Sequence, residues 1–127
     1  MNRAIAPAGI APPAATYAHA VLSESPSRLL HTSGAVPVAP DGSVPEDLAA
    51  QAERVWANLG AVLDEAGMAA TDVVSITTYV VAGEPLAPVM AARDRFMGDH
   101  IAASTLVTVP ALARPEWRVE IALVAAR

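Results

Sequence analysis

The chain has 127 residues, a formal net charge of −5 and 54% hydrophobic residues, with no cysteine and with arginine as its only strongly basic residue type. This composition fits one folded domain over residues 1–127, and it excludes disulfides, thiolate chemistry, lysine Schiff bases and a basic nucleic-acid-binding surface. No apolar run reaches the length of a membrane-spanning helix, and residues 1–15 lack a signal-peptide core, so we expect a cytoplasmic protein with no membrane partner.

The first third of the chain predicts two short strands that pair with each other. Residues 1–15 are rich in alanine and proline, and we expect them to lie extended on the surface. Residues 16–22 alternate roughly between apolar and polar side chains, and a turn separates them from a second strand over residues 28–32. Together these strands predict a β-hairpin. Ser33-Gly34 is expected to break or bulge the second strand.

A long helix is predicted to begin after Ser43. The Ser43-x-x-Glu46 spacing is that of a capping box, and Pro45 is tolerated in the first turn of a helix. Apolar residues then recur at three- and four-residue spacing, which gives the helix one buried face. Gly67 fits the left-handed position just past its end. The residues expected on the buried face are Leu48, Ala52, Val55, Leu59, Val62 and Ala66.

The rest of the chain predicts three strands and a second helix. Residues 72–81 are β-branched and apolar on both faces, which is typical of a central strand. A helix over residues 86–97 follows, and residues 104–109 and 118–125 form the last two strands. The order β-β-α-β-α-β-β indicates an α+β fold with both helices on one face of a mixed sheet. Because the other face would stay uncovered in a single copy, we expect an oligomer that buries it.

Glu120 is the most informative polar residue, because it lies inside the apolar run Val-Glu-Ile-Ala-Leu-Val-Ala. A carboxylate in such a strand must lie at a sheet edge, at an interface between subunits, or beside a cation. Buried acids are frequent general acid/base groups, so Glu120 is a candidate catalytic residue. The alternative is a structural ion pair with Arg118 or with an arginine of a neighbouring subunit.

A second candidate feature is Gly34 beside Ser33. A glycine at a strand end lets a ligand approach the backbone, and its N–H can hold an oxyanion. A simple β-bulge glycine is the alternative. Tyr17 offers a phenol to a ligand or is an ordinary strand aromatic, and His31 is a candidate wall of the same pocket.

The histidines and the arginines of the second helix have ordinary interpretations. His19, His31 and His100 lack metal-ligand spacing, so we expect no metal site. His19 and His31 are expected to face each other across the predicted hairpin. Arg93 and Arg95 are expected to form solvated ion pairs with neighbouring acids on the helix surface.

Six segments of the chain form a recognisable series: Ser33-Gly34-Ala35-Val36-Pro37, Asp41-Gly42-Ser43-Val44-Pro45, Leu63-Asp64-Glu65-Ala66-Gly67-Met68, Thr77-Thr78-Tyr79-Val80, Ala103-Ser104-Thr105-Leu106-Val107 and Val119-Glu120-Ile121. In this order they resemble the RidA (YjgF/YER057c) family of reactive-intermediate deaminases. The resemblance implies a chorismate-mutase-like α+β fold and a homotrimer with three ligand clefts between subunits. It also implies hydrolysis of enamines and imines, such as 2-aminoacrylate, without a cofactor. Ribonuclease activity, also attached to the family, does not suit the acidic balance.

The resemblance also marks where this sequence departs from the family pattern. The family's deaminases carry the arginine that binds the substrate carboxylate at the place that Ser104 occupies here. Met90 stands in place of a frequent asparagine, and Leu106 stands in place of a cysteine. Arg114 and Arg118 are the candidates for supplying the missing cation.

The resemblance therefore implies a small-molecule cleft between the subunits of a homotrimer. The expected reaction is hydrolysis of an imine, an enamine or a similar labile intermediate to a carbonyl compound and ammonia. The alternative is a non-catalytic ligand-binding or regulatory trimer of the same fold. The expected catalytic residues are Glu120 as the acid/base and Tyr17 and Ser33 as orienting groups, and the expected lining residues are Gly34, Ser104, Met90, Leu106 and His31.

Overall fold

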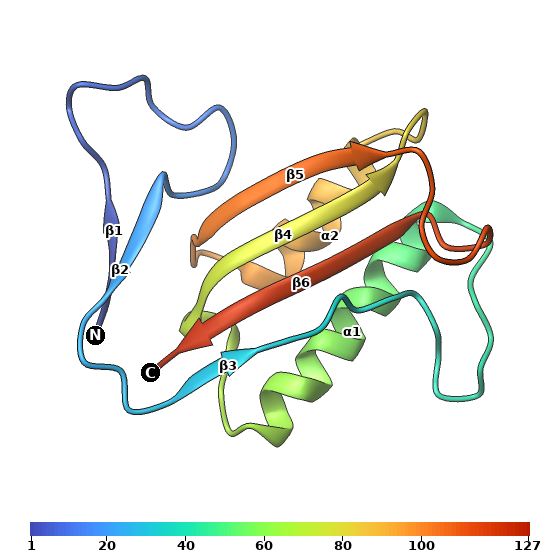
Figure 1. Ribbon diagram of the computed structural model, residues 1–127, viewed down its shortest axis with the longest axis horizontal. Helices are drawn as coiled ribbons and strands as arrows, with labels where there is room; N and C mark the ends of the chain where they lie inside the picture. Colours follow the sequence, from blue (N-terminus) through green and yellow to red (C-terminus); the bar gives the residue numbers. More distant parts are fainter.

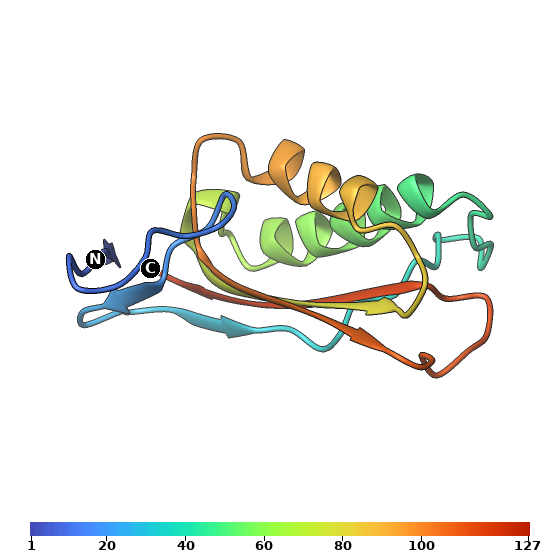
Figure 2. The same ribbon diagram turned by 90° about the horizontal axis from the view of Figure 1, so that it is seen from above.

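Two helices lie on one face of a four-stranded sheet (Figures 1 and 2). The computed structural model describes residues 1–127. In the sheet, the order is β3-β6-β4-β5, with β4 and β5 parallel and the other pairs antiparallel. The elements are β1 (Asn2–Ile5), β2 (Ala20–Ser23), β3 (Leu29–His31), α1 (Leu48–Glu65), a 3₁₀ turn (Ala70–Asp72), β4 (Val73–Val81), α2 (Ala87–Met97), β5 (Ala103–Val109) and β6 (Val119–Ala126). This arrangement confirms the expected α+β fold with both helices on one face of a mixed sheet.

The central strands β4 and β6 have one face turned toward the helices. In β6, every second side chain from Val119 to Ala125 is buried, and the side chains between them are only partly covered. The buried set meets α1 and α2 in one hydrophobic core that includes Trp56, Leu59 and Ile76. The alternation therefore gives the sheet one closed face and one open face.

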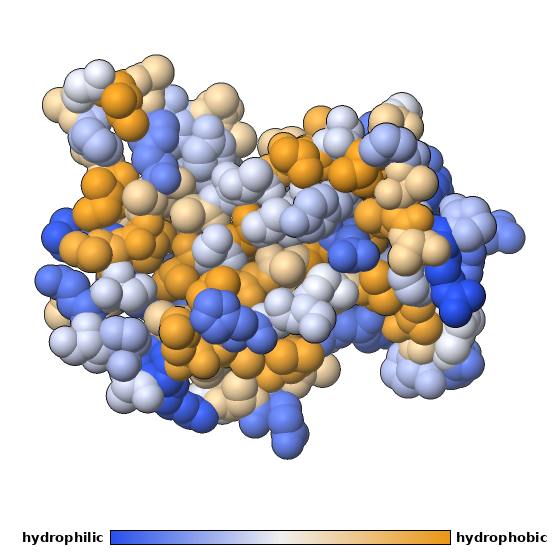
Figure 3. Space-filling model, viewed as in Figure 1, coloured by the Kyte–Doolittle hydropathy of each residue, from blue (hydrophilic) through white to orange (hydrophobic).

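The open face consists of weakly polar and apolar side chains. Register places Tyr79 of β4 opposite Glu120 of β6 and beside Val107 of β5, so all three point away from the helices. Figure 3 shows this face: hydrophobic and pale side chains predominate over the strands, and strongly hydrophilic ones gather mostly toward the ends of the molecule. Glu120 is the one carboxylate that the strands β4, β5 and β6 place on it.

Helix α1 ends where predicted, but its cap and its start are four residues later than predicted. Asp47, not Ser43, is the N-cap, and its Oδ2 accepts the Ala50 N–H at 3.1 Å. Ser43 instead bonds to Asp41, which lowers the pKa of that carboxyl. The prediction of Val62 on the buried face is wrong: Val62 is 42% exposed, and the chain buries Leu63 instead. Gly67 has φ +66°, as expected just past the helix end.

The predicted hairpin is wrong, because its two strands belong to different sheets. β2 pairs with β1, a strand that residues 1–15 were not expected to contain, and β3 pairs with β6. The Ser27 and Arg28 N–H groups both donate to the Arg127 carbonyl, which commits β3 to the end of β6. His19 and His31 therefore do not face each other.

The Ser33-Gly34 bulge is present in the extension of β3. The Thr32 N–H donates to Leu123, and Ala35 exchanges hydrogen bonds with Ile121, so Ser33 and Gly34 together stand opposite a single residue of β6. Neither α1 nor α2 combines the length and the hydrophobicity that a membrane-spanning helix needs.

Candidate functional site

The Glu120 carboxylate has no partner within the chain. β6 has a neighbouring strand on each side, so Glu120 is not at a sheet edge. The three ion pairs of the structure, Arg93–Asp94, Arg95–Glu53 and Arg118–Glu84, do not include it. Neither a sheet edge nor an ion pair within the chain therefore accounts for this carboxylate.

The backbone at Gly34 lies directly against this carboxylate. A Cβ atom at Gly34 would lie 2.1 Å from Oε2 of Glu120 and 2.7 Å from its Cδ. Only glycine leaves this space free. The N–H groups of Ser33 and Gly34 donate no hydrogen bond within the chain. The carboxylate therefore lies beside a backbone segment with free N–H donors, a combination that can position a water molecule and hold a developing oxyanion.

Ser33 and His31, which were also expected to line this part of the site, precede Gly34 on the same chain segment. Ser33 is exposed beside Gly34. His31 pairs in register with Val124, which places it on the open face that also carries Glu120, and it is exposed. Asn58 on α1 holds the segment in place, because its Nδ2 donates to the Val36 and Val38 carbonyls at 3.0 Å each.

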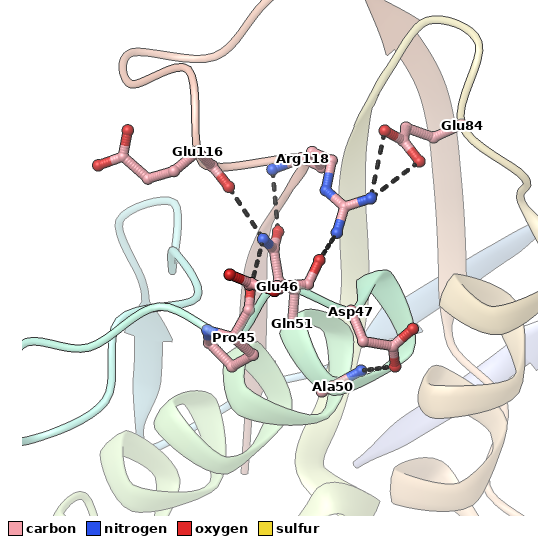
Figure 4. A network of polar contacts seen from close by, with 8 residues as sticks. All are labelled: Pro45, Glu46, Asp47, Ala50, Gln51, Glu84, Glu116 and Arg118. Atoms are coloured by element: carbon pink, nitrogen blue, oxygen red, sulfur yellow. Dashed lines mark hydrogen bonds and ion pairs between the residues drawn. The ribbon is translucent and has the colours of Figure 1, made fainter.

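Arg118 does not pair with Glu120, because a separate polar network holds it (Figure 4). Its Nη1 lies 3.3 Å from Oε2 of Glu84, its Nη2 donates to the Glu46 carbonyl, and its backbone N–H donates to Oε1 of Gln51 at 3.0 Å. Buried Gln51 in turn donates to the Pro45 and Glu116 carbonyls. Arg118 therefore ties the start of α1 to the start of β6, and the suggested Arg118–Glu120 pair is wrong.

A second group of predicted residues meets on the opposite face of the sheet. A pocket of about 260 Å³ opens between α2, β5 and the segment before β2. The Ala18 N–H donates to the Ala102 carbonyl at 2.9 Å, which places Tyr17 beside the start of β5. The residues lining the pocket are Ala15, Tyr17, Leu86, Met90, Arg93, Ser104 and Leu106.

The cation of this pocket is Arg93, which sequence reasoning placed in solvent. Arg93 is only 6% exposed, whereas Arg95 on the same helix is exposed and pairs with Glu53. Met90 and Arg93 are three residues apart and therefore share the helix face that meets β5. In the sequence, this three-residue spacing from Met90 was the signal that could have placed Arg93 at the pocket. Neither Arg114, which lies over the Trp117 ring at 5.8 Å, nor Arg118 lines the pocket.

The predicted site residues thus form two groups that lie on opposite faces of the sheet within one chain. The first group holds Glu120, Ser33, Gly34 and His31 on the open face, and the second holds Tyr17, Met90, Ser104 and Leu106 on the helix side of β5. No cluster of three or more His, Cys, Asp or Glu side chains is present.

Comparisons with known proteins agree with this architecture. A family model described as Endoribonuclease L-PSP matches residues 9–127. A RutC family protein of Haemophilus influenzae is 38% identical over 96 residues, which cover 75% of this chain and 68% of the relative. The 2-iminobutanoate/2-iminopropanoate deaminase of Escherichia coli K12 is 35% identical over 103 residues, which cover 78% and 80%.

Solved structures show the same fold. The Rid family protein YyfB from Yersinia pestis superposes with a TM-score of 0.88 at 36% identity, over 99% of this chain and 98% of that one. Escherichia coli TdcF with bound serine superposes with a TM-score of 0.73 at 25% identity, over 96% and 93% of the two chains. The fold expected from the sequence is therefore confirmed by similarity to experimental structures.

Proposed function

Because this chain belongs to the RidA (YjgF/YER057c) family, we propose that it hydrolyses an imine or enamine to a carbonyl compound and ammonia. The observation that carries the proposal is the unpaired Glu120 carboxylate held against the backbone of Gly34. Relatives named as 2-iminobutanoate/2-iminopropanoate deaminases support the reaction class.

Hydrolysis of an imine requires one group that acts as both general base and general acid. Glu120 takes a proton from water as the water oxygen bonds to the imine carbon, and it passes that proton to the imine nitrogen, which gives the neutral carbinolamine. Glu120 then takes the hydroxyl proton of the carbinolamine and passes it to the nitrogen as the C=O bond forms, the C–N bond breaks and ammonia leaves. One water is consumed, and no electrons enter or leave. An enamine first takes a proton on its β-carbon to become the imine.

The free N–H groups of Ser33 and Gly34 complete this half of the site. They donate to the attacking water or to the oxygen that bears charge as the carbinolamine forms. Positioned acid/base catalysis of this kind contributes about 10²- to 10⁴-fold in rate. We assign Ser33, through its backbone and hydroxyl, to orienting the water.

A homotrimer accounts for the separation of the two residue groups. In the proposed assembly, the open sheet faces pack together, and the Glu120 group of one copy meets the Tyr17–Ser104 pocket of the next. The apolar character of the open face, including exposed Val107, supports this packing. Light scattering should give three times the 13.0 kDa mass of the chain, and the mass of one chain alone would contradict it.

Ammonia release tests the proposed reaction. Imines are generated in the assay by an amino-acid oxidase, and release is compared among wild type, Glu120→Gln and Glu116→Gln. Glu116 is exposed, and its side chain makes no hydrogen bond or ion pair, so Glu116→Gln is the matched control. We expect Glu120→Gln to fall by about 10²-fold or more and the control to match wild type. Equal rates for all three proteins, no faster than buffer, would favour the alternative.

That alternative, a non-catalytic ligand-binding trimer, is supported by Ser104, since this position lacks the arginine of the family's deaminases. It predicts binding of 2-oxo acids with no turnover of the matching imines. Cytoplasmic location is part of both proposals, and cell fractionation tests it.

A further inference from the structure

The pocket beside α2 contains a buried cation that its own chain leaves incompletely paired. We propose that Arg93 binds the carboxylate of the substrate there, and that the pocket selects 2-imino acids with a sizeable apolar side chain. The choice of substrate rests on the proposed function, whereas binding of an apolar carboxylate at Arg93 stands independently of turnover.

Arg93 uses few of its hydrogen-bond donors within the chain. Its Nε donates to Oδ1 of Asp94 at 3.1 Å. Nη2 lies 3.0 Å from the same oxygen but is not aligned for a hydrogen bond, and it is buried with no hydrogen-bond partner. Nη1 donates to no atom of the chain. A guanidinium has five N–H donors, so most of those on a side chain that is only 8% exposed remain available.

Asp94, the ion-pair partner of Arg93, lies largely in solvent. The side chain of Asp94 is 45% exposed, so its carboxylate is largely hydrated and neutralises Arg93 only in part. A buried arginine is stable when planar acceptors satisfy its fork, and a carboxylate does so with two parallel hydrogen bonds. The missing ligand is therefore an anion.

The shape of the space around Arg93 tells which side the anion approaches from. On the side of Met97 and Gly98, the gap holds about 10 Å³, which is room for about one water molecule. On the side of Leu106, the pocket holds about 260 Å³. A small organic acid fits only the second space.

The walls of this larger space define the rest of the ligand. Five of its seven lining residues are hydrophobic, among them Leu86, Met90 and Leu106. Tyr17 and Ser104 are the lining residues with a polar group besides Arg93. A carboxylate at Arg93 therefore places an aliphatic side chain against Leu86 and Met90. Each CH₂ group buried there strengthens binding by about fourfold, so a leucine-derived ligand should bind about tenfold or more tightly than an alanine-derived one.

Calorimetry with stable product analogues tests the proposal without turnover. The ligands are 4-methyl-2-oxopentanoate, its neutral amide and pyruvate. Wild type should bind 4-methyl-2-oxopentanoate at least tenfold more tightly than either of the other two. Arg93→Gln should weaken binding of the acid by about 10- to 100-fold and leave binding of the amide unchanged. Arg95→Gln, two residues along the same helix, is the matched control and should bind as wild type does.

Two further variants keep the proposal testable if Arg93→Gln folds poorly. Asp94→Asn removes the competing carboxylate and should tighten binding of the acid several-fold. The double variant Arg93→Gln/Ser104→Arg returns a guanidinium to the same pocket from β5, and it should recover acid binding to within about tenfold of wild type. Wild type that binds acid and amide equally, or binds neither, would overturn the proposal, as would unchanged acid binding in a folded Arg93→Gln variant. If Arg93→Gln does not fold, unchanged acid binding in Asp94→Asn would overturn it.

Failure of this inference is separable from failure of the proposed function. Glu120→Gln should keep its affinity for the acid while losing turnover. Absence of turnover in wild type contradicts the deaminase proposal but not the role of Arg93, and turnover that survives Glu120→Gln contradicts only the catalytic role of Glu120. Conversely, acid binding that survives Arg93→Gln contradicts the role of Arg93 and leaves the chemistry of Glu120 untouched.

Discussion

Replacing Gly34 by alanine tests whether the contact between backbone and carboxylate matters for turnover. The added Cβ would lie 2.1 Å from Oε2, 2.7 Å from Cδ and 2.9 Å from Cγ of Glu120. Oε2 must therefore move by about 1 Å or more to reach ordinary van der Waals distance. The atoms that give way belong to the end of a flexible side chain, so the backbone of the bulge can stay where it is.

The expected effects on catalysis and on stability differ sharply. A displacement of about 1 Å at a catalytic group lowers the rate by about 10²-fold. Turning Glu120 into another rotamer costs about 1 kcal/mol, and replacing glycine by alanine regains about 0.4–1 kcal/mol by restricting the unfolded chain. We therefore expect kcat for imine hydrolysis to fall about 100-fold and the free energy of unfolding to change by less than about 1 kcal/mol.

Paired measurements of ammonia release and urea unfolding check this expectation. Gly9→Ala is the control, because a Cβ at Gly9 meets no atom within 4 Å. In a Glu120→Gln background, Gly34→Ala should reduce turnover little further, since both changes act on one carboxylate. Turnover of Gly34→Ala within twofold of wild type would refute the reasoning. So would unfolding of this variant under conditions where Gly9→Ala is stable.

Two more predictions concern stability. Gln51→Leu should lower the free energy of unfolding by about 2–4 kcal/mol in urea titrations. Gln51 is 1% exposed, and its loss leaves the Pro45 and Glu116 carbonyls and the Arg118 N–H without partners. A loss below about 1 kcal/mol would mean that water replaces these hydrogen bonds. On α1, Leu63→Ala should lose about 2–5 kcal/mol and Val62→Ala less than about 0.5 kcal/mol, and the opposite order would contradict the helix orientation described above.

Local patterns in the sequence predicted the elements that are regular over several turns or several strand residues. The β-branched run of β4 and the apolar stripe of α1 are patterns among neighbouring residues. They therefore predicted the type of each element and its approximate position in the sequence. The partner strands of β2 and β3 could not be predicted from local patterns. β3, for example, pairs Leu29 with Ala126 at the far end of the chain. A three-residue strand carries too little pattern to specify such a partner.

The candidate site shows the same limit. Glu120 was recognisable because a carboxylate is unusual among the apolar residues of β6, and Gly34 because glycine marks a bulge. Arg93 was missed because an arginine on a helix is usually solvated. Its burial depends on which face of α2 lies over β5, and that is fixed by packing between distant segments. Arg118 was misassigned for a similar reason, since its partners Glu84 and Glu46 come from loops.

Subunit mixing tests most directly whether one active site is built from two copies of the chain. Glu120→Gln and Arg93→Gln, each expected to be strongly impaired alone at low imine concentration, are unfolded together in equal amounts, refolded and assayed for ammonia release. In a trimer whose clefts each take Glu120 from one copy and Arg93 from the next, about a quarter of the clefts regain both residues. The account predicts recovery of about a quarter of wild-type turnover, whereas no recovery in a mixture shown to contain hybrid trimers would contradict it.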